Sequence, residues 1–307
     1  MKYLLFLFLA TLLFISNSCT KNNPDPSWLE VTKWTLNANP NLTGLEGSLT
    51  QNISEAWVYV DDEIIGVFEV PFKIPILKEG SVNIKIYPAI KNNGISATKK
   101  VYPFLEPYVV TANLVKNQTL TLNPITQYYN AVQFWIEDFE DAAVKIENDP
   151  NSAAQITTDN DPLILQSFNG NNYGKVILNS VDTTWIGYTN VEMNLPRSAE
   201  VYLEVDFYNT NTVVTGLLAI SPSGVQPNPN IQLNAQSPSS VKWKKIYIDL
   251  RELVSNSNPL AYFEQSFQAF QEFSVNQGPI QSQEQKLLAL IIRQLTEDIF
   301  NKAFANW

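Results

Sequence analysis

The chain has 307 residues and a formal net charge of −10 at pH 7, with 45% hydrophobic residues, 12% aromatic residues and no histidine. The acidic balance argues against a nucleic-acid partner, since phosphate binding needs clustered Lys and Arg. The apolar content argues against global disorder. The missing histidine excludes Ser-His and Cys-His nucleophiles and His-ligated metal centres, so we expect a protein without enzymatic activity.

The first eighteen residues, 1–18, are predicted to be an export signal. Lys2 precedes an apolar run from Tyr3 to Ile15, and three small residues follow directly before Cys19, the only cysteine in the chain. The run is too short to cross a bilayer as a helix. Cys19 is therefore either the acylated residue of a lipoprotein or a free thiol behind an ordinary secretory signal.

The ending Ser16-Asn17-Ser18-Cys19 resembles the lipobox of Bacteroidota lipoproteins. The resemblance implies lipidation at Cys19 and a chain anchored by lipid in the cell outer membrane, because several acyl chains together hold a protein stably. Residues 19–27 then comprise the lipidated cysteine and a short polar spacer with two prolines. The length that remains suffices for about two domains.

Residues 28–122 contain short apolar runs separated by turn residues, which predicts β-structure. The apolar run 56–60 is followed by an acidic turn at 61–63 and a second apolar run at 64–68, as in a hairpin. In 81–87, apolar and polar residues alternate with period two. The residues VYVDD, Ile65-Gly66 and Glu79-Gly80 resemble PEGA-type surface modules. This resemblance implies a small Ig-like sandwich that serves as a spacer or adhesion module.

A second β-rich block is predicted over 131–260, after a connector at 123–130. It opens at 132–141, and later strand candidates are 174–178, 185–188, 201–208, 214–220 and 243–250. The segments WIEDFED, VYLEVDFYN and WKKIYIDL resemble jelly-roll modules of the carbohydrate-binding superfamily. The resemblance implies a jelly-roll-like sandwich.

The C-terminal segment 261–307 has a different pattern. A capping box at Ser282 and Gln285 begins a predicted amphipathic helix, 282–305, with apolar residues on two sides. The elements FEQSF and LTEDIFNKAFANW resemble the end of LptE-type lipopolysaccharide-assembly lipoproteins. In that family the lipoprotein plugs an outer-membrane barrel. Two origins stay open for this tail: a natural fusion, or a recombined product joined near 262–267.

Acidic residues are densest at Glu137-Asp138 and Glu140-Asp141. Several carboxylate oxygens without nitrogen or sulfur ligands are what Ca²⁺ prefers, and the jelly-roll resemblance points to Glu140 or Asp141. Such clustered acids more often lie at a solvent-exposed strand end. Both interpretations, a calcium site and an exposed strand end, stay open. Apart from structural calcium, we expect no cofactor.

Aromatic side chains that stack on sugar rings, beside amides that bond the hydroxyls, would form a glycan site. The candidates are Trp185, Tyr188 and Tyr173, with Asn172, although aromatic residues of a sandwich more often belong to its core. Thr183, in Asp182-Thr183-Thr184, fits the pattern that Bacteroidota O-glycosylate on exported proteins.

These observations predict a mainly β chain: an Ig-like sandwich, a jelly-roll-like sandwich and a C-terminal amphipathic helix. The leading hypothesis is a non-enzymatic outer-membrane lipoprotein that serves as a binding or scaffold module for a glycan or an envelope protein. The alternative is an LptE-like assembly factor with an outer-membrane barrel as partner. A carboxylate-dependent glycosidase is a third hypothesis, which absent turnover on a polysaccharide panel would exclude.

Overall fold

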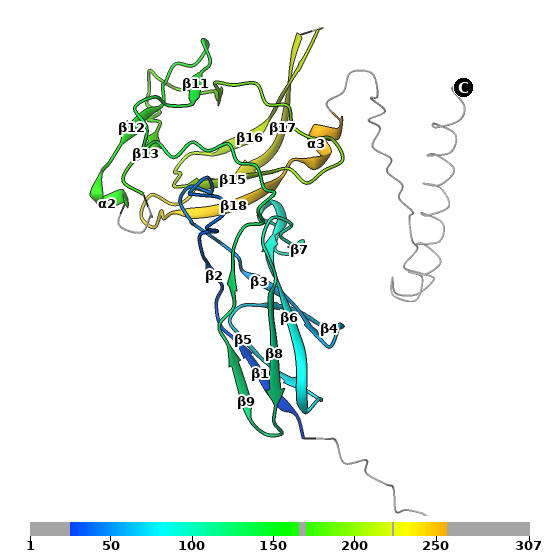
Figure 1. Ribbon diagram of the computed structural model, residues 1–307. Helices are drawn as coiled ribbons and strands as arrows, with labels where there is room; N and C mark the ends of the chain where they lie inside the picture. Colours follow the sequence, from blue (N-terminus) through cyan, green and yellow to red (C-terminus); the bar gives the residue numbers. More distant parts are fainter. Residues whose placement is uncertain (1–24, 166–169, 223, 257–307) are drawn as a thin grey trace, which may run out of the picture. The chain divides into compact units, whose positions relative to one another are not determined.

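The computed structural model describes residues 25–165, 170–222 and 224–256 (Figure 1). The chain is mainly β and forms several sheets, as its sequence predicts. Cys19, the export signal and the predicted helix 282–305 lie outside the described residues. Contacts group the chain up to Ser255 into one compact unit and the rest into another. No helix within the described ranges is long and apolar enough to cross a membrane.

The first part of the chain is a β-sandwich, which we call the first sandwich (Figure 1). One sheet has the order β5–β1–β9: β1 (Ser27–Val31), β5 (Phe72–Ile76) and β9 (Thr119–Leu122). The other has the order β4–β3–β6–β7, with β8 also paired to β6: β3 (Glu55–Val60), β4 (Glu63–Glu69), β6 (Gly80–Lys91), β7 (Lys99–Val101) and β8 (Tyr108–Leu114). A short helical turn, η1 (Asn92–Gly94), follows β6.

Alternating side chains of the two sheets meet in one core. Leu29 and Val31 of β1 are fully buried, as are Val58 of β3 and Ile84 and Ile86 of β6, and all belong to the same cluster. The polar residues between them face outward, because successive side chains of a strand point to opposite faces. The period-two pattern of 81–87 therefore indicated the correct buried face.

The predicted acidic hairpin is present between β3 and β4, with a tighter turn than the sequence suggested. Val60 pairs with Glu63, so only Asp61 and Asp62 lie in the turn. Their φ angles are 52° and 64°, as in the type I′ turn that matches the twist of a hairpin. The Asp61 carboxylate accepts the backbone N–H of Asn83 at 2.9 Å, which fastens the turn to β6.

The segment 123–130, expected to be a connector, belongs to the first sandwich instead. Its strand β10 (Ile125–Thr126) pairs in parallel with β2 (Thr35–Leu36), and Tyr128 is buried and bridges to Leu105. The spacer also ends earlier than expected, because Ser27 is buried and already part of β1. Both segments form hydrogen bonds with strands that are distant in the sequence. Their polar composition did not predict this pairing.

The second part, residues 146–256, is called the second β-block. Its strands form four two-stranded sheets: β11 (Ile146–Asn148) with β14 (Gly187–Thr189), β12 (Thr157–Asp159) with β13 (Tyr173–Lys175), β15 (Tyr202–Phe207) with β18 (Lys244–Asp249), and β16 (Val213–Ser221) with β17 (Gly224–Leu233). Two short helices are α2 (Pro162–Leu165) and α3 (Arg251–Asn256). A second core gathers Val201, Leu233, Ile246, Ile248, Leu250 and Val254.

The strands predicted at 201–208, 214–220 and 243–250 are confirmed to within two residues, whereas the strand predicted at 132–141 is wrong. In that segment the Glu137 carboxylate accepts the backbone N–H groups of Phe139 and Lys145. Asp138 likewise accepts the N–H of Glu140 at 3.2 Å. These local side-chain bonds satisfy the donors that a strand would give to a ladder, so the acidic segment forms a loop.

Candidate functional site

The two acids proposed for calcium have separate partners in the structure. Glu140 accepts the backbone N–H groups of Asn171 at 2.6 Å and Asn172 at 3.0 Å, and these bonds hold its pKa below the usual value. Asp141 pairs with Lys145 at 3.2 Å. Across the residues that the structure describes, no group of three or more His, Cys, Asp or Glu side chains is placed to hold a metal ion. Calcium binding stays a prediction.

The aromatic candidates are divided between two sheets. Tyr173 lies on β13 and is buried, with its hydroxyl 3.1 Å from Asp159 and its ring in a T-shaped contact with Trp243. Most of its ring is therefore covered, and a role for this residue in sugar stacking stays a prediction. The Asn172 amide N–H donates to Glu140 at 2.8 Å, which links it to the loop rather than to a ligand site.

Tyr188 lies on the other sheet, in β14, and Trp185 precedes that strand by two residues. The Trp185 indole N–H donates to Asn148 at 2.8 Å, and Tyr188 lies opposite Glu147 in the ladder with β11. Both side chains are half-buried, so part of each ring faces solvent. Thr183 is exposed, as a modified hydroxyl would need to be. These two aromatic residues are the more exposed candidates for ring stacking.

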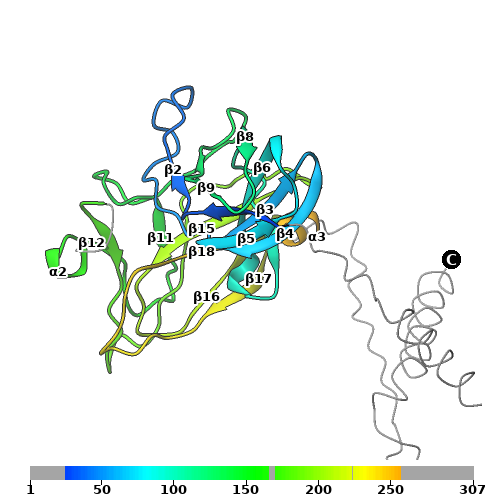
Figure 2. The same ribbon diagram turned by 90° about the horizontal axis from the view of Figure 1, so that it is seen from below.

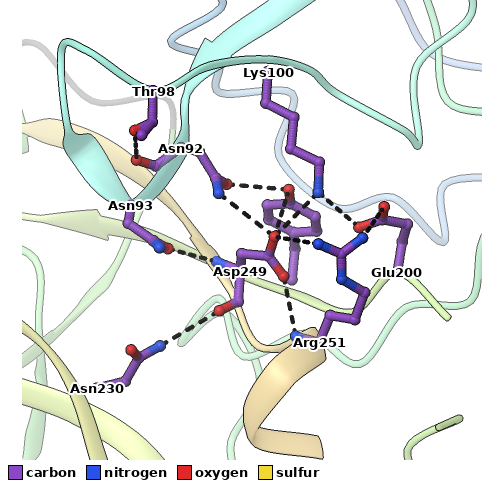
Figure 3. Close-up of polar contacts among 9 residues, drawn as sticks. Asn92, Asn93, Thr98, Lys100, Glu200, Asn230, Asp249 and Arg251 are labelled. Atoms are coloured by element: carbon purple, nitrogen blue, oxygen red, sulfur yellow. Dashed lines mark hydrogen bonds and ion pairs between the residues drawn. The ribbon is translucent and has the colours of Figure 1, made fainter. Parts of the chain in front are cut away.

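An extended polar arrangement that the sequence did not indicate lies where the first sandwich meets the second β-block. We call it the junction network: Asn92, Asn93, Lys100, Glu200, Tyr202, Asp249 and Arg251 (Figure 3). Lys100 of β7 pairs with Glu200 at 2.9 Å and with Asp249 at 3.1 Å. Arg251 reaches the other oxygen of Glu200 at 3.0 Å. Two cations and two carboxylates thus alternate across the junction.

Neutral groups complete the junction network. The backbone N–H of Asp249 donates to Asn93 at 2.8 Å, and the Tyr202 hydroxyl donates to Asn92 at 3.1 Å (Figure 3). Lys100 also lies over the Tyr202 ring, 5.1 Å from its centroid. The η1 turn after β6 is therefore bound to β15 and β18 by neutral groups, and the charged contacts come from Lys100 on β7.

The charge states of the junction network follow from these contacts. Burial acts to lower the pKa of the Lys100 ammonium, but hydrogen bonds to Tyr202, Glu200 and Asp249 outweigh it and raise that pKa. Burial acts to raise the pKa of Asp249, but the Arg251 backbone N–H and the Lys100 ammonium outweigh it and lower that pKa. Both groups are therefore charged at neutral pH.

A second group, the tyrosine cluster, lies beside the junction network: Tyr102, Tyr128, Tyr247, Glu204 and Lys245. The hydroxyls of Tyr102 and Tyr128 donate to Glu204 at 2.5 Å and 3.0 Å. Lys245 pairs with the same carboxylate at 2.9 Å. Tyr247 belongs to the core of the first sandwich although it lies on β18, and its hydroxyl accepts the Asn52 N–H at 3.0 Å.

We expect the folded chain to lose stability as the pH rises above about 10, where free phenols ionise. Burial raises the pKa of Tyr102, Tyr128 and Tyr247, and the Glu204 carboxylate raises them further. Because these phenols ionise first in the unfolded chain, their contribution is complete below the unfolded pKa and is lost as the pH rises toward the folded one. Urea midpoints across this pH range measure the loss.

Tyr102→Phe is the internal control for this pH dependence. It removes one of the three phenols, so the alkaline loss should become shallower than in the unmodified chain. A midpoint that stays constant from about pH 8 to about pH 11 would contradict the assignment of raised pKa values to buried phenols.

Comparisons of the chain with protein-family models, with curated proteins and with solved structures found no match. Inference about function therefore uses the residues and contacts of this chain alone. The junction network and the tyrosine cluster join two β-structures through partly buried polar contacts and a shared aromatic core. Such an arrangement holds two parts in one fixed geometry.

Proposed function

We propose that this chain is a non-enzymatic lipoprotein of the outer membrane, in which the first sandwich supports the second β-block as a scaffold or binding module. The observation that carries the proposal is the double set of partly buried contacts at the junction, centred on Lys100 and Glu204. A spacer that presents a binding module needs a stiff connection, because a flexible one would cost ordering entropy on binding. The lipobox resemblance at Cys19 supplies the proposed anchor.

The proposed ligand is a glycan or another envelope protein. Trp185 and Tyr188 support a glycan, because they combine partial exposure with neighbouring polar groups, Asn148 and Glu147. Aromatic faces and amide or carboxylate groups together match the apolar faces and hydroxyls of a sugar ring. The LptE-like function rests on residues 262–307, outside the described residues, and stays a second hypothesis.

Cys19→Ala is expected to abolish acylation of the chain. The full-length protein, produced in a bacterium with the lipoprotein pathway, should incorporate labelled palmitate, and the variant without the thiol should not. Ser18→Ala is the matched control, since it keeps both a small residue and the cysteine and should retain the label. An unlabelled wild-type chain would indicate an ordinary secretory signal and overturn the proposed anchor.

The ligand class is tested by isolating the lipidated full-length chain from its own outer membrane and identifying what accompanies it. Recovery of surface glycan or envelope proteins, without the lipopolysaccharide-transport barrel, supports the binding-module proposal. Recovery of that barrel, lost on deletion of 281–307, favours the assembly-factor hypothesis instead. Trp185→Ala should lower glycan recovery, whereas Trp57→Ala in the first sandwich should not.

A further inference from the structure

The hairpin of β16 and β17 has an unusual outer face. Its inner face packs on the second core through Val213, Leu217, Ile231 and Leu233. On the outer face Val214, Leu218, Ile220 and Val225 expose between 42% and 60% of their surface. Figures 1 and 2 show the two strands as a long ribbon, and among the described residues each has only the other as ladder partner.

The hairpin also lacks charge. Residues 207–241 contain no Asp, Glu, Lys or Arg, although the whole chain has a net charge of −10. Two copies of an acidic protein repel each other over most of their surfaces. They can approach at this hairpin without bringing like charges together.

The register shows which backbone groups of the hairpin point outward. Ser221 lies opposite Gly224 and closes a two-residue turn, so this pair is hydrogen-bonded. Bonded and non-bonded pairs alternate in an antiparallel ladder. The pairs Ile220–Val225 and Leu218–Pro227 are therefore non-bonded, and their N–H and C=O groups point away from the partner strand.

The two edges of the hairpin consequently differ. On β17, Pro227 and Pro229 occupy outward-pointing positions, so this edge lacks two of the donors that an added strand would need. On β16, the N–H and C=O groups of Gly216, Leu218 and Ile220 point outward, and the strand contains neither proline nor charge. Natural sheets usually block such an edge with proline or lysine. Within the described ranges, the β17 edge is therefore closed by proline and the β16 edge is open.

We propose that β16 pairs with β16 of a second copy, antiparallel across a two-fold axis, in a sheet of order β17–β16–β16–β17. The open edge needs an uncharged extended strand with free groups on one side, and β16 of another copy meets that requirement. The proline-bearing β17 edges then lie on the outside of the sheet. Pairing therefore ends at two copies, because a two-fold contact closes the assembly.

The outward positions also permit a self-consistent register. With the axis at Leu217, each Gly216 lies opposite a Leu218, and each Val214 lies opposite an Ile220. All four residues have the same parity along β16, so their outward N–H and C=O groups form hydrogen-bonded pairs. Cross-strand contacts between Val214 and Ile220 add apolar packing on the outer face.

The test is the mass of the full lipidated chain, measured by sedimentation equilibrium in a density-matched detergent. We expect two chains per particle. Leu218→Pro removes one outward donor from each copy and should raise the dimer dissociation constant about tenfold or more. Leu218→Lys, which needs no change of φ, should act in the same direction by placing two like charges near the axis. Gly216 is left unchanged, because a Cβ there would lie 2.4 Å from the Asn228 carbonyl oxygen.

Val225→Pro and Val225→Lys are the matched controls. Val225 is exposed like Leu218, 60% against 42%, and also has an outward N–H, but it lies on the closed β17 edge. Both controls should remain dimeric, with unchanged circular dichroism in all variants. A single-chain mass, an open-ended series of larger assemblies, or dissociation by the Val225 variants would each overturn the proposal. A single-chain mass would leave the open edge for a strand of another protein.

Discussion

Lys245→Met is expected to lower the free energy of unfolding by about 3 kcal/mol, the lower end of the range for breaking a buried ion pair. The Lys245 side chain is 9% exposed and lies 2.9 Å from Glu204 and 3.3 Å from Asp206. Methionine fills a similar volume but leaves both carboxylates without their cation. Urea denaturation of the full chain measures the change.

The control for this prediction is Lys85→Met. Lys85 pairs with Asp62 at 2.5 Å, but the Asp62 side chain is 79% exposed, so solvent screens the pair. The urea midpoint should therefore remain that of the unmodified chain. Equal effects of the two substitutions would show that Lys245 contributes no more to the free energy of unfolding than the surface residue Lys85.

Ile248→Ala should lower the free energy of unfolding by about 2–5 kcal/mol, the range for truncating a buried isoleucine. Ile248 is fully buried in the second core, whereas its neighbour Tyr247 on β18 is buried in the first. Because one strand contributes to both cores, we expect both to unfold in a single transition. Urea unfolding with hydrogen exchange followed at each core measures the loss and its extent.

Ile177→Ala is the matched control, since Ile177 is 60% exposed and its truncation leaves no cavity in a core. It should change the midpoint little. In Ile248→Ala, the backbone amides of Leu203 and Val205 report on the second core, and those of Ile84 and Ile86 report on the first. If the second pair keeps its hydrogen-exchange protection after the first pair has lost it, the two cores unfold separately. The junction would then not couple them, and the stiff connection in the proposed function would lose its support.

Local patterns were sufficient wherever the structure follows from neighbouring residues. The alternation in 81–87 and the acidic turn after 56–60 predicted β6 and the β3–β4 hairpin, because burial of one strand face and the φ angles of a two-residue turn are local properties. The strands β15, β16 and β18 were predicted for the same reason.

Local patterns failed where a distant or competing partner decides the conformation. The acidic segment 132–141 forms a loop because Glu137 bonds nearby backbone N–H groups. The polar segment 123–130 joins a sheet because β2, some ninety positions earlier, accepts β10 as a neighbour. Tyr173 was a candidate for sugar stacking by residue type alone, and only the structure shows that it is buried, with contacts to Trp243 and Asp159.

The sequence by itself determined that the chain is mainly β and where several of its strands run, because side-chain alternation and turn chemistry act over a few residues. It also supplied the acidic charge and the missing histidine that direct the functional hypothesis. Only the tertiary structure decided that Tyr102 and Glu204, which are 102 positions apart, share a hydrogen bond. Such a junction depends on which strands pack together, and a contact between distant residues leaves no periodic signal in the residues that make it.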